Sequence, residues 1–423
     1  MTQNRGPGQV CIKLTIQAQF VIIAPGVLNH PKVPDISGLD EFQGHVFHTA
    51  RWDYGYTGGS LRDPVLTDLK DKRVGIIGTG ATAIQAVPQL AKWEKELYVF
   101  QRTPARVDIR NQMATDEALW ISKIAGKPWW QLAQRQNFNA VRAGALVDED
   151  LVADGWCATP SAAASLGSPV KGIISPERVK DHGAEVYAID QESSERTPGF
   201  HDEYLASFNQ SNVHLVDTDG KGIERLNWRG LIANGKQYDI ELLLFGTGYR
   251  APAAHSGSPA VAAKITIAGW EGRSLEAKYL SCGVSTLHGI SSHGFPNLFY
   301  FGTSQAASAF NIVCMADVQV QHIAYILTEA TRQHDHAVVE VTKEAVKEWA
   351  AKIAKRGAWS AVMLGCTPSW LNGEGAGSKA NSDVREQVKK ARSAPWGEGF
   401  RSYEDVLECW RAQGDLRGIG ISG

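Results

Sequence analysis

A glycine-containing segment, Gly78-x-Gly80-x-x-Ala83, carries the strongest chemical signal in the sequence. It directly follows a short apolar run at residues 74–77 and precedes a predicted helix at residues 84–93. In such a segment the first glycine allows a tight turn, the second lets the backbone approach a pyrophosphate, and a small third residue lets helix and strand pack closely. The phosphate would lie at the helix N-terminus, where free N–H groups and the helix dipole favour negative charge. The spacing therefore predicts a dinucleotide site; the alternative is a glycine turn in another kind of α/β unit.

The end of the next predicted strand, residues 96–100, indicates which dinucleotide would bind. A site for NAD usually carries Asp or Glu about 20 residues after the glycines, where it holds the ribose 2′-hydroxyl. Here Arg102 and Thr103 stand in that region, and a guanidinium can pair with a 2′-phosphate while a hydroxyl can hydrogen-bond it. The sequence therefore predicts NADP(H) rather than NAD(H). The alternative is that Arg102 is a solvated charge at a strand end.

A second group of chemically capable residues is Phe42-x-Gly44-x-x-x-His48-Thr49-x-x-Trp52-Asp53. His48 lies close in sequence to an indole and a carboxylate, so the group could orient a bound cofactor. The same residues also fit a buried, hydrogen-bonded histidine in a linker between domains. On chemistry alone the second interpretation is the better one.

Both groups need an α/β framework to position them. Residues 74–103 form a strand–turn–helix–strand unit of about 30 residues, as a dinucleotide-binding crossover requires. Further strands are predicted at residues 10–16, 18–24, 212–216, 240–245 and 297–302, and helices at residues 316–331 and 343–354.

Length and composition set the broad class. At about 150 residues per domain, 423 residues predict two or three domains, and a 43% hydrophobic content is enough for a large core. A formal net charge of −2 gives no basic excess to drive nucleic-acid binding. The six cysteines are scattered without a CxxC pair or metal-ligand spacing, so we expect reduced thiols in a cytoplasmic protein and no metal site. We expect no signal peptide and no membrane span.

The residues around His48 and the glycine segment together resemble the Baeyer–Villiger monooxygenases, flavin enzymes that insert an oxygen atom next to a ketone carbonyl. The family fingerprint FxGxxxHTxxW followed by Pro or Asp is satisfied by Phe42 to Asp53. Nearly the whole chain shares the resemblance, most similar to the subgroup that acts on large cyclic ketones and fungal polyketides. The supporting stretches are residues 20–26, 78–85, 101–104, 200–205, 245–249, 294–298 and 366–375.

The resemblance implies FAD and NADPH as cofactors, and a bulky hydrophobic ketone and O2 as substrates. The NADPH site would include Gly78, Thr79, Gly80, Ala81, Thr82, Ala83, Gln85, Arg102 and Thr103. The linker between the cofactor domains would supply His48, Thr49, Trp52 and Asp53, and the part near the flavin ring would supply Gly248 and Asn311.

The resemblance also implies a catalytic arginine that stabilises the negative peroxide and the tetrahedral adduct. In the family it usually precedes a stretch similar to Phe200 to Leu205. Aligned on that stretch, the family position falls on Thr197 here, and Arg196 is one place early. Arg196 is therefore the candidate; the alternative is a surface charge paired with Glu192 or Glu195.

The expected fold is α/β with two Rossmann-like domains for FAD and NADP, the first N-terminally truncated and the NADP domain inserted into it. No GxGxxG of the kind that binds the FAD pyrophosphate in the family precedes the fingerprint in these 423 residues. We expect residues 1–40 to be a remnant of the FAD-binding domain, 41–70 the linker, 71–235 the NADP-binding domain with an insertion, and 236–423 the rest of the FAD-binding domain with the substrate region.

The sequence is compatible with two functions. The leading hypothesis is a Baeyer–Villiger-type monooxygenase that uses NADPH and O2 to convert a bulky ketone to an ester or lactone. The alternative is a truncated, non-oxygenating relative that binds NADPH or uses the old cavity without flavin, or acts as a partner protein.

Overall fold

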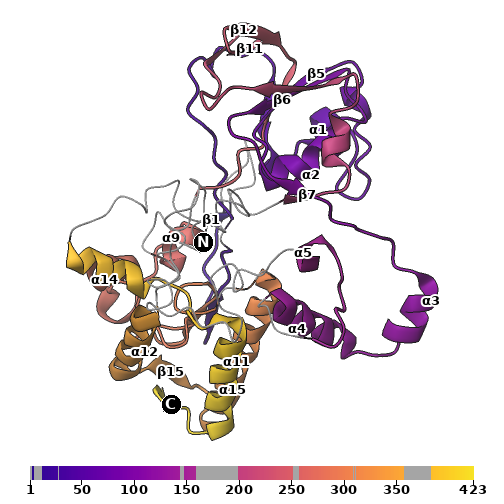
Figure 1. Ribbon diagram of the computed structural model, residues 1–423. Helices are drawn as coiled ribbons and strands as arrows, with labels where there is room; N and C mark the ends of the chain where they lie inside the picture. The colour runs from indigo at the N-terminus through magenta and orange to yellow at the C-terminus, as the bar shows by residue number, and fades with distance from the viewer. Residues whose placement is uncertain are drawn as a thin grey trace. The chain divides into compact units, whose positions relative to one another are not determined.

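The computed structural model describes residues 2–3, 12–26, 28–142, 147–158, 199–250, 257–307, 309, 311–356 and 383–423. These fall into two compact units (Figure 1). Unit 1 comprises residues 1–27, 255–360 and 381–423, and unit 2 comprises residues 28–254 and 361–380.

Unit 2 is built on a five-stranded, wholly parallel sheet. Its spatial order is β4 (His45–His48), β13 (Leu242–Phe245), β5 (Arg73–Ile77), β6 (Glu96–Gln101) and β9 (Val213–Asp217). Read from β5, chain order runs outward through β6 to β9 on one side and then returns to β13 on the other. The strand order therefore reverses between β5 and β13, which is where doubly wound sheets bind ligands.

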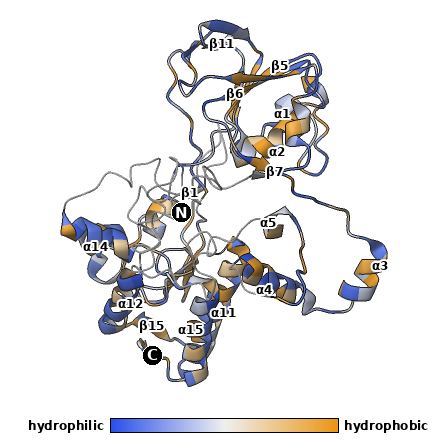
Figure 2. Cartoon of the chain, in the orientation of Figure 1, coloured by the Kyte–Doolittle hydropathy of each residue, from blue (hydrophilic) through white to orange (hydrophobic). Residues whose placement is uncertain are grey.

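Helix α2 (Ala81–Leu90) connects β5 to β6 and covers one face of the sheet. Its apolar side chains pack with those of the strands, and Figure 2 shows the helix in hydrophobic colours. The shared core contains Ile84, Val87 and Leu90 from the helix, together with Ile76 and Val99 from the strands. The predicted crossover unit is present, although the helix begins three residues earlier than the predicted residue 84 because Gly80 serves as its N-cap.

The other face of the sheet packs against a three-stranded antiparallel meander in the same unit. Leu226 and Leu231 from the meander share a core cluster with Phe100 and Leu243 from the parallel strands. The meander strands are β10 (Arg225–Asn227), β11 (Gly230–Ala233) and β12 (Lys236–Asp239).

Short elements complete the described part of unit 2. They are η1 (Thr49–Arg51), α1 (Tyr54–Thr57), η2 (Thr67–Leu69), β7 (Val107–Asp108), α3 (Glu117–Leu119), η3 (Trp120–Ile124), α4 (Trp130–Arg142), α5 (Gly155–Ala158), β8 (Gly199–Phe200) and α8 (Tyr204–Ser207). Strands β7 and β8 pair in parallel, so the two places where the chain enters and leaves residues 109–198 lie next to each other.

Unit 1 contains the parallel strand pair β3 (Val21–Ile23) and β14 (Leu298–Tyr300) and the antiparallel pair β15 (Val338–Val341) and β16 (Ile419–Ser422). The predicted helices at residues 316–331 and 343–354 lie inside α11 (Ile312–Gln333) and α12 (Lys343–Arg356). The remaining elements are β1 (Thr2–Gln3), β2 (Ile12–Lys13), α9 (Pro259–Ala263), η5 (Trp270–Gly272), α10 (Leu275–Cys282), α14 (Val384–Arg392) and α15 (Gly399–Gln413).

A buried histidine pair joins α11 to the core of unit 1. His288 Nδ1 and His322 Nε2 are 3.0 Å apart, and the two residues are 4% and 0% exposed. The rings of Trp349 and Trp410 pack edge-on against them. Burial lowers the pKa of His288 to about 3 and that of His322 to about 2, so both imidazoles are neutral in the folded protein at neutral pH.

The predicted boundaries at residues 40, 70 and 235 stay a prediction. Unit 2 takes in residues 28–70 and 236–254 because β4 and β13 complete its parallel sheet. None of the described helices is long and apolar enough to cross a membrane.

Candidate functional site

The carboxyl ends of four neighbouring strands gather most of the predicted site residues at one edge of the sheet in unit 2. The last pairs in register are Phe245 with His48 and with Ile77, and Ile77 with Phe100. The segments that leave this edge side by side are residues 48–49 after β4, 246–248 after β13, 78–80 after β5 and 102–103 after β6. We call this the coenzyme edge.

Gly78 forms the tight turn that the sequence required. Its φ is +111°, and a Cβ placed on it would lie 2.6 Å from the carbonyl oxygen of Gly246. Only glycine fits here, because both the backbone conformation and the close approach of the chain after β13 exclude a side chain. The turn therefore fixes the junction between β5 and β13, where the strand order reverses.

Gly80 has the opposite surroundings. It is exposed, and no atom lies within 4 Å of the position that its Cβ would occupy. It is the N-cap of α2, and as a glycine it brings no side chain to cap the first N–H groups of that helix. A bare, uncapped helix N-terminus of this kind suits a pyrophosphate. Ala83 is fully buried against the sheet, as the small third residue should be.

A hydrogen bond between two threonines links the turns that follow β5 and β6. The Thr79 hydroxyl donates to the carbonyl oxygen of Thr103 at 3.2 Å and so ties the β5 turn to the end of β6. Arg102 lies next to this contact and is exposed. Within the described residues no acidic side chain pairs with its guanidinium, so the cation stands at the edge without a protein counter-charge. Gln85 donates to the Ala81 carbonyl of its own helix at 3.0 Å, and Thr82 is half-buried in the first turn of that helix.

His48 ends β4 with its ring enclosed at the coenzyme edge. Its Nδ1 accepts a hydrogen bond from the backbone N–H of Ala50 at 3.0 Å, so the neutral imidazole carries its proton on Nε2. Nε2 is buried and makes no hydrogen bond within the described part of the chain. Burial lowers the pKa of His48, and the Gly248 carbonyl only partly offsets it. Next to it, the Thr49 hydroxyl donates to the Phe245 carbonyl at 3.2 Å.

The turn after β13 is anchored by a segment from the start of the unit. The Thr247 hydroxyl donates to the Lys32 carbonyl, and the Lys32 N–H donates to the Gly248 carbonyl at 2.9 Å. Gly248 has a φ of +72° and open space at its Cβ position. The Tyr249 ring meets the His48 ring edge-on at 5.9 Å between centroids. These contacts hold the turn after β13 in place beside His48.

Trp52 and Asp53 do not point to the coenzyme edge. Trp52 packs on Phe47 in the core and donates from its indole nitrogen to the Thr57 hydroxyl at 3.1 Å. The chain turns back through η1, so Asp53 pairs with His45 at 2.9 Å, at the start of β4 rather than at its end. The structure therefore divides the fingerprint into a pair at the coenzyme edge, His48 and Thr49, and a pair that packs against the core and the start of β4, Trp52 and Asp53.

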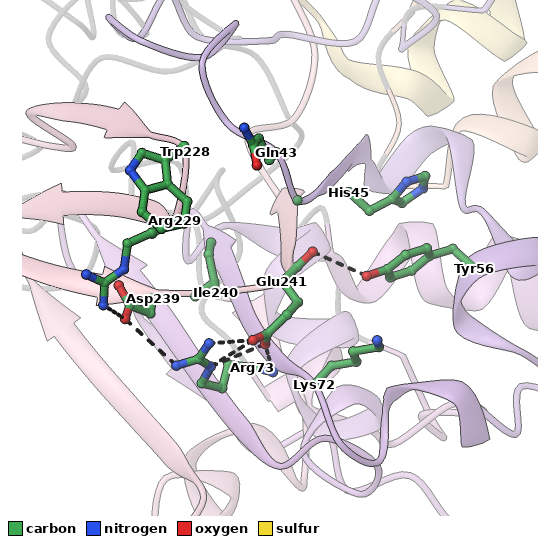
Figure 3. Close-up of a pocket in the computed structure, with 11 residues that line it drawn as sticks. Gln43, His45, Tyr56, Lys72, Arg73, Trp228, Arg229, Asp239, Ile240 and Glu241 are labelled. Atoms are coloured by element: carbon green, nitrogen blue, oxygen red, sulfur yellow. Dashed lines mark hydrogen bonds and ion pairs between the residues drawn. The ribbon is translucent and has the colours of Figure 1, made fainter.

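An open groove of 710 Å³ lies at the amino ends of β4, β5 and β13 (Figure 3). Four of its charged groups are paired with one another: Arg73 bonds Glu241, and Asp239 pairs with both Arg73 and Arg229. Burial raises the pKa of Glu241, but the hydrogen bonds from Arg73 outweigh this and lower it. Because the groove is at the opposite ends of the strands from the glycine turn, we do not assign it to the coenzyme.

Two predicted residues are not among those described in unit 2. Asn311 belongs to unit 1, where its side chain caps α11 by accepting from the N–H groups of Val313 and Cys314 at 3.1 and 3.3 Å. Arg196 lies outside the described residues. Within unit 2, the structure brings together the predicted NADPH residues with His48, Thr49 and Gly248, and it turns Trp52 and Asp53 away from this edge.

The fold and the edge define a dinucleotide-binding α/β protein of the doubly wound class. No protein-family model matches the chain. It is 43% identical to the polycyclic ketone monooxygenase of Thermothelomyces thermophilus over an alignment 454 positions long, gaps included. The alignment spans all of this chain and 69% of that protein. The chain is 41% identical to an FAD-binding monooxygenase of Penicillium brasilianum, with 96% of this chain and 67% of the relative covered.

Solved structures agree with these relatives. The polycyclic ketone monooxygenase structure superimposes with a TM-score of 0.91 at 42% identity, covering all of this chain and 70% of that one. A cyclohexanone monooxygenase from Rhodococcus superimposes with a TM-score of 0.65 at 21% identity, with 96% of this chain and 75% of that one covered, which supports the fold alone. The chain belongs to the Baeyer–Villiger class of FAD-binding monooxygenases.

Sequence reasoning did not identify the residues whose hydrogen bonds hold the turns of the coenzyme edge in place. Lys32, Gln101 and Thr218 act through backbone and side-chain hydrogen bonds between segments far apart in the chain. No local motif marks such residues. The only available signal was the polar ending of each apolar strand.

Proposed function

We propose that this chain uses NADPH and O2 to insert an oxygen atom next to the carbonyl of a bulky, ring-containing ketone, giving an ester or lactone. Membership of the Baeyer–Villiger class supports the reaction type. The name of the most informative relative, a polycyclic ketone monooxygenase, supports the class of substrate. The observation that carries the proposal is the coenzyme edge, where an uncapped helix N-terminus and an arginine lie at the reversal of strand order.

The residues of the coenzyme edge offer groups that suit the parts of NADPH. The pyrophosphate would lie over Gly80 and receive the N–H groups of Ala81, Thr82 and Ala83. Arg102 would pair with the 2′-phosphate, and Thr103 would add a hydrogen bond. His48 would be neutral beside the coenzyme with its proton on Nε2, because its other nitrogen is already bonded to Ala50.

FAD, which the names of several relatives specify, would supply the oxygen chemistry when bound. The described residues proposed for it are few, namely Asn311 at the start of α11 and Gly248 at the coenzyme edge. Arg196 remains our candidate for stabilising negative charge on the reacting oxygen atoms, on the sequence argument alone. We also keep the predicted division into FAD-binding, linker and NADP-binding parts as part of this proposal.

The test is to supply the purified chain with FAD, NADPH, isotopically labelled O2 and a panel of fused-ring ketones. We expect ketone-dependent NADPH consumption and a product heavier by one labelled oxygen atom. NADPH binding with no flavin retained and no labelled product would overturn the proposal and favour the non-oxygenating alternative. A general reductase would consume NADPH and reduce the ketone without taking up the label.

A further inference from the structure

The turn that follows β9, residues Thr218–Gly222, is hydrogen-bonded to the backbone of Gln101 and Arg102. Strands β6 and β9 are parallel neighbours, with Gln101 in register with Asp217. The two strands therefore end together, and the residues after them leave the sheet side by side. One of these is Arg102, and the other is Thr218.

Thr218 is 1% exposed, and its N–H and hydroxyl make three hydrogen bonds at this point. Its N–H and its hydroxyl both donate to the Gln101 carbonyl, at 2.8 and 2.9 Å. The same hydroxyl oxygen accepts from the Gly222 N–H at 3.0 Å, which closes the turn. A single buried hydroxyl thus connects the end of β6 to both ends of the turn.

A further contact joins the turn to Arg102 itself. The Gly220 N–H donates to the Arg102 carbonyl at 3.0 Å. A Cβ on Gly222 would lie 4.0 Å from Arg102 Cδ, so a side chain at this position would meet the aliphatic part of the arginine. Behind them, the Gln101 side chain donates to the Asp217 carboxylate at 3.1 Å.

The guanidinium of Arg102 has no acidic partner within the described residues, so no ion pair sets its direction. A long side chain without such a partner samples many rotamers, and a ligand must order it on binding. Fixing the backbone of the arginine reduces that cost. The hydrogen bond that the Arg102 carbonyl accepts comes from the turn after β9.

We propose that Thr218 is a positioning residue that, through the Thr218–Gly222 turn, holds Arg102 and so sets the preference for a 2′-phosphorylated coenzyme. This inference rests on the proposed function, because it assigns a cause to the NADPH preference of the same site. Thr218 itself does not touch the coenzyme.

The experiment compares binding of NADP+ and NAD+ to the full 423-residue chain by calorimetry, so that it does not depend on turnover. In Thr218→Val the hydroxyl is lost at nearly constant shape. We expect NADP+ binding to weaken about 5- to 10-fold and NAD+ binding to change less than about 2-fold, the scale of one or two hydrogen bonds. Thr218→Ser keeps the hydroxyl and should restore the preference. Thr67→Val, which removes an exposed hydroxyl from the same unit, should leave both affinities unchanged.

Gly222→Asn provides a second variant if Thr218→Val fails to fold. Asparagine adopts the positive φ of +76° at this position more readily than other residues, and its side chain would crowd Arg102. We expect the same selective loss of NADP+ affinity. A wild-type preference for NADP+ that survives in folded Thr218→Val or Gly222→Asn would overturn the inference and leave the proposed function standing. An equal loss of both coenzymes would also overturn it, whereas a wild type with no NADP+ preference would contradict the proposed function itself.

Discussion

The buried pair His288 and His322 should make unit 1 sensitive to acid. An unfolded histidine has a pKa of about 6.5, whereas burial lowers the pKa of these two to about 3 and about 2. Because the folded pKa values are the lower ones, the stabilisation is present above pH 6.5 and is lost as the pH falls. At pH 5 only the unfolded state takes up these protons, which removes about 2 kcal/mol for each imidazole and about 4 kcal/mol for the pair relative to pH 7.5.

The perturbation is the double variant His288→Gln with His322→Gln, which keeps a donor and an acceptor on each side chain but cannot titrate. Urea unfolding at pH 7.5, 6 and 5 can be followed by tryptophan fluorescence, since Trp349 and Trp410 contact the pair. We expect the free energy of unfolding of the wild type to fall by about 4 kcal/mol more than that of the variant between pH 7.5 and 5.

A matched control is His336→Gln, because His336 is an exposed histidine of the same unit. Its acid dependence should follow that of the wild type. The reasoning would be refuted if the double variant lost stability toward pH 5 as steeply as the wild type, whatever its absolute stability at pH 7.5.

Three further predictions concern unit 2. Arg102→Ala should weaken NADPH binding by about 1.5–3 kcal/mol, the scale of a charge-assisted hydrogen bond, with NADH almost unchanged; equal losses in titrations of both coenzymes would contradict the 2′-phosphate role. Gly78→Ala should lower the free energy of unfolding by about 1–3 kcal/mol because its φ is positive and its Cβ would meet the Gly246 carbonyl, whereas Gly80→Ala should leave thermal unfolding unchanged and weaken only coenzyme binding; similar melting curves for the two variants would count against this. Glu94 is 6% exposed and both of its carboxylate oxygens are buried without a hydrogen-bond partner among the described residues, so burial raises its pKa well above the usual value. A raised pKa means stability that is lost as the pH rises, so Glu94→Gln should be more stable than the wild type at pH 8, by about 1–3 kcal/mol, with the gain disappearing near pH 4; a constant difference across that range in denaturation experiments would oppose it.

The crossover from β5 through α2 to β6 could be predicted because its signals are local. An apolar run, two glycines and a small third residue lie next to one another in sequence, and each has a direct physical requirement. The α/β class followed from the same unit and is confirmed.

The neighbours of β5 could not be predicted in the same way. That β13 would lie between β4 and β5, bringing Gly246 against Gly78, depends on pairing between strands far apart in the chain. The two ends of the fingerprint show the same limit. His48 and Asp53 are five residues apart, yet they serve opposite ends of β4 because the turn at η1 reverses the chain. Sequence spacing alone does not reveal such a reversal.

The place of β13 has a consequence for how the protein is made. β4 and β5 leave the ribosome early, yet in the finished sheet they are separated by a strand translated much later. Until that strand arrives, the nascent chain presents two open backbone edges and an apolar surface, the features that promote association between chains. A translation product that ends before residue 242 therefore has no completed site for a nicotinamide nucleotide. At that stage chaperones, rather than the coenzyme, should determine how much of the nascent chain escapes aggregation.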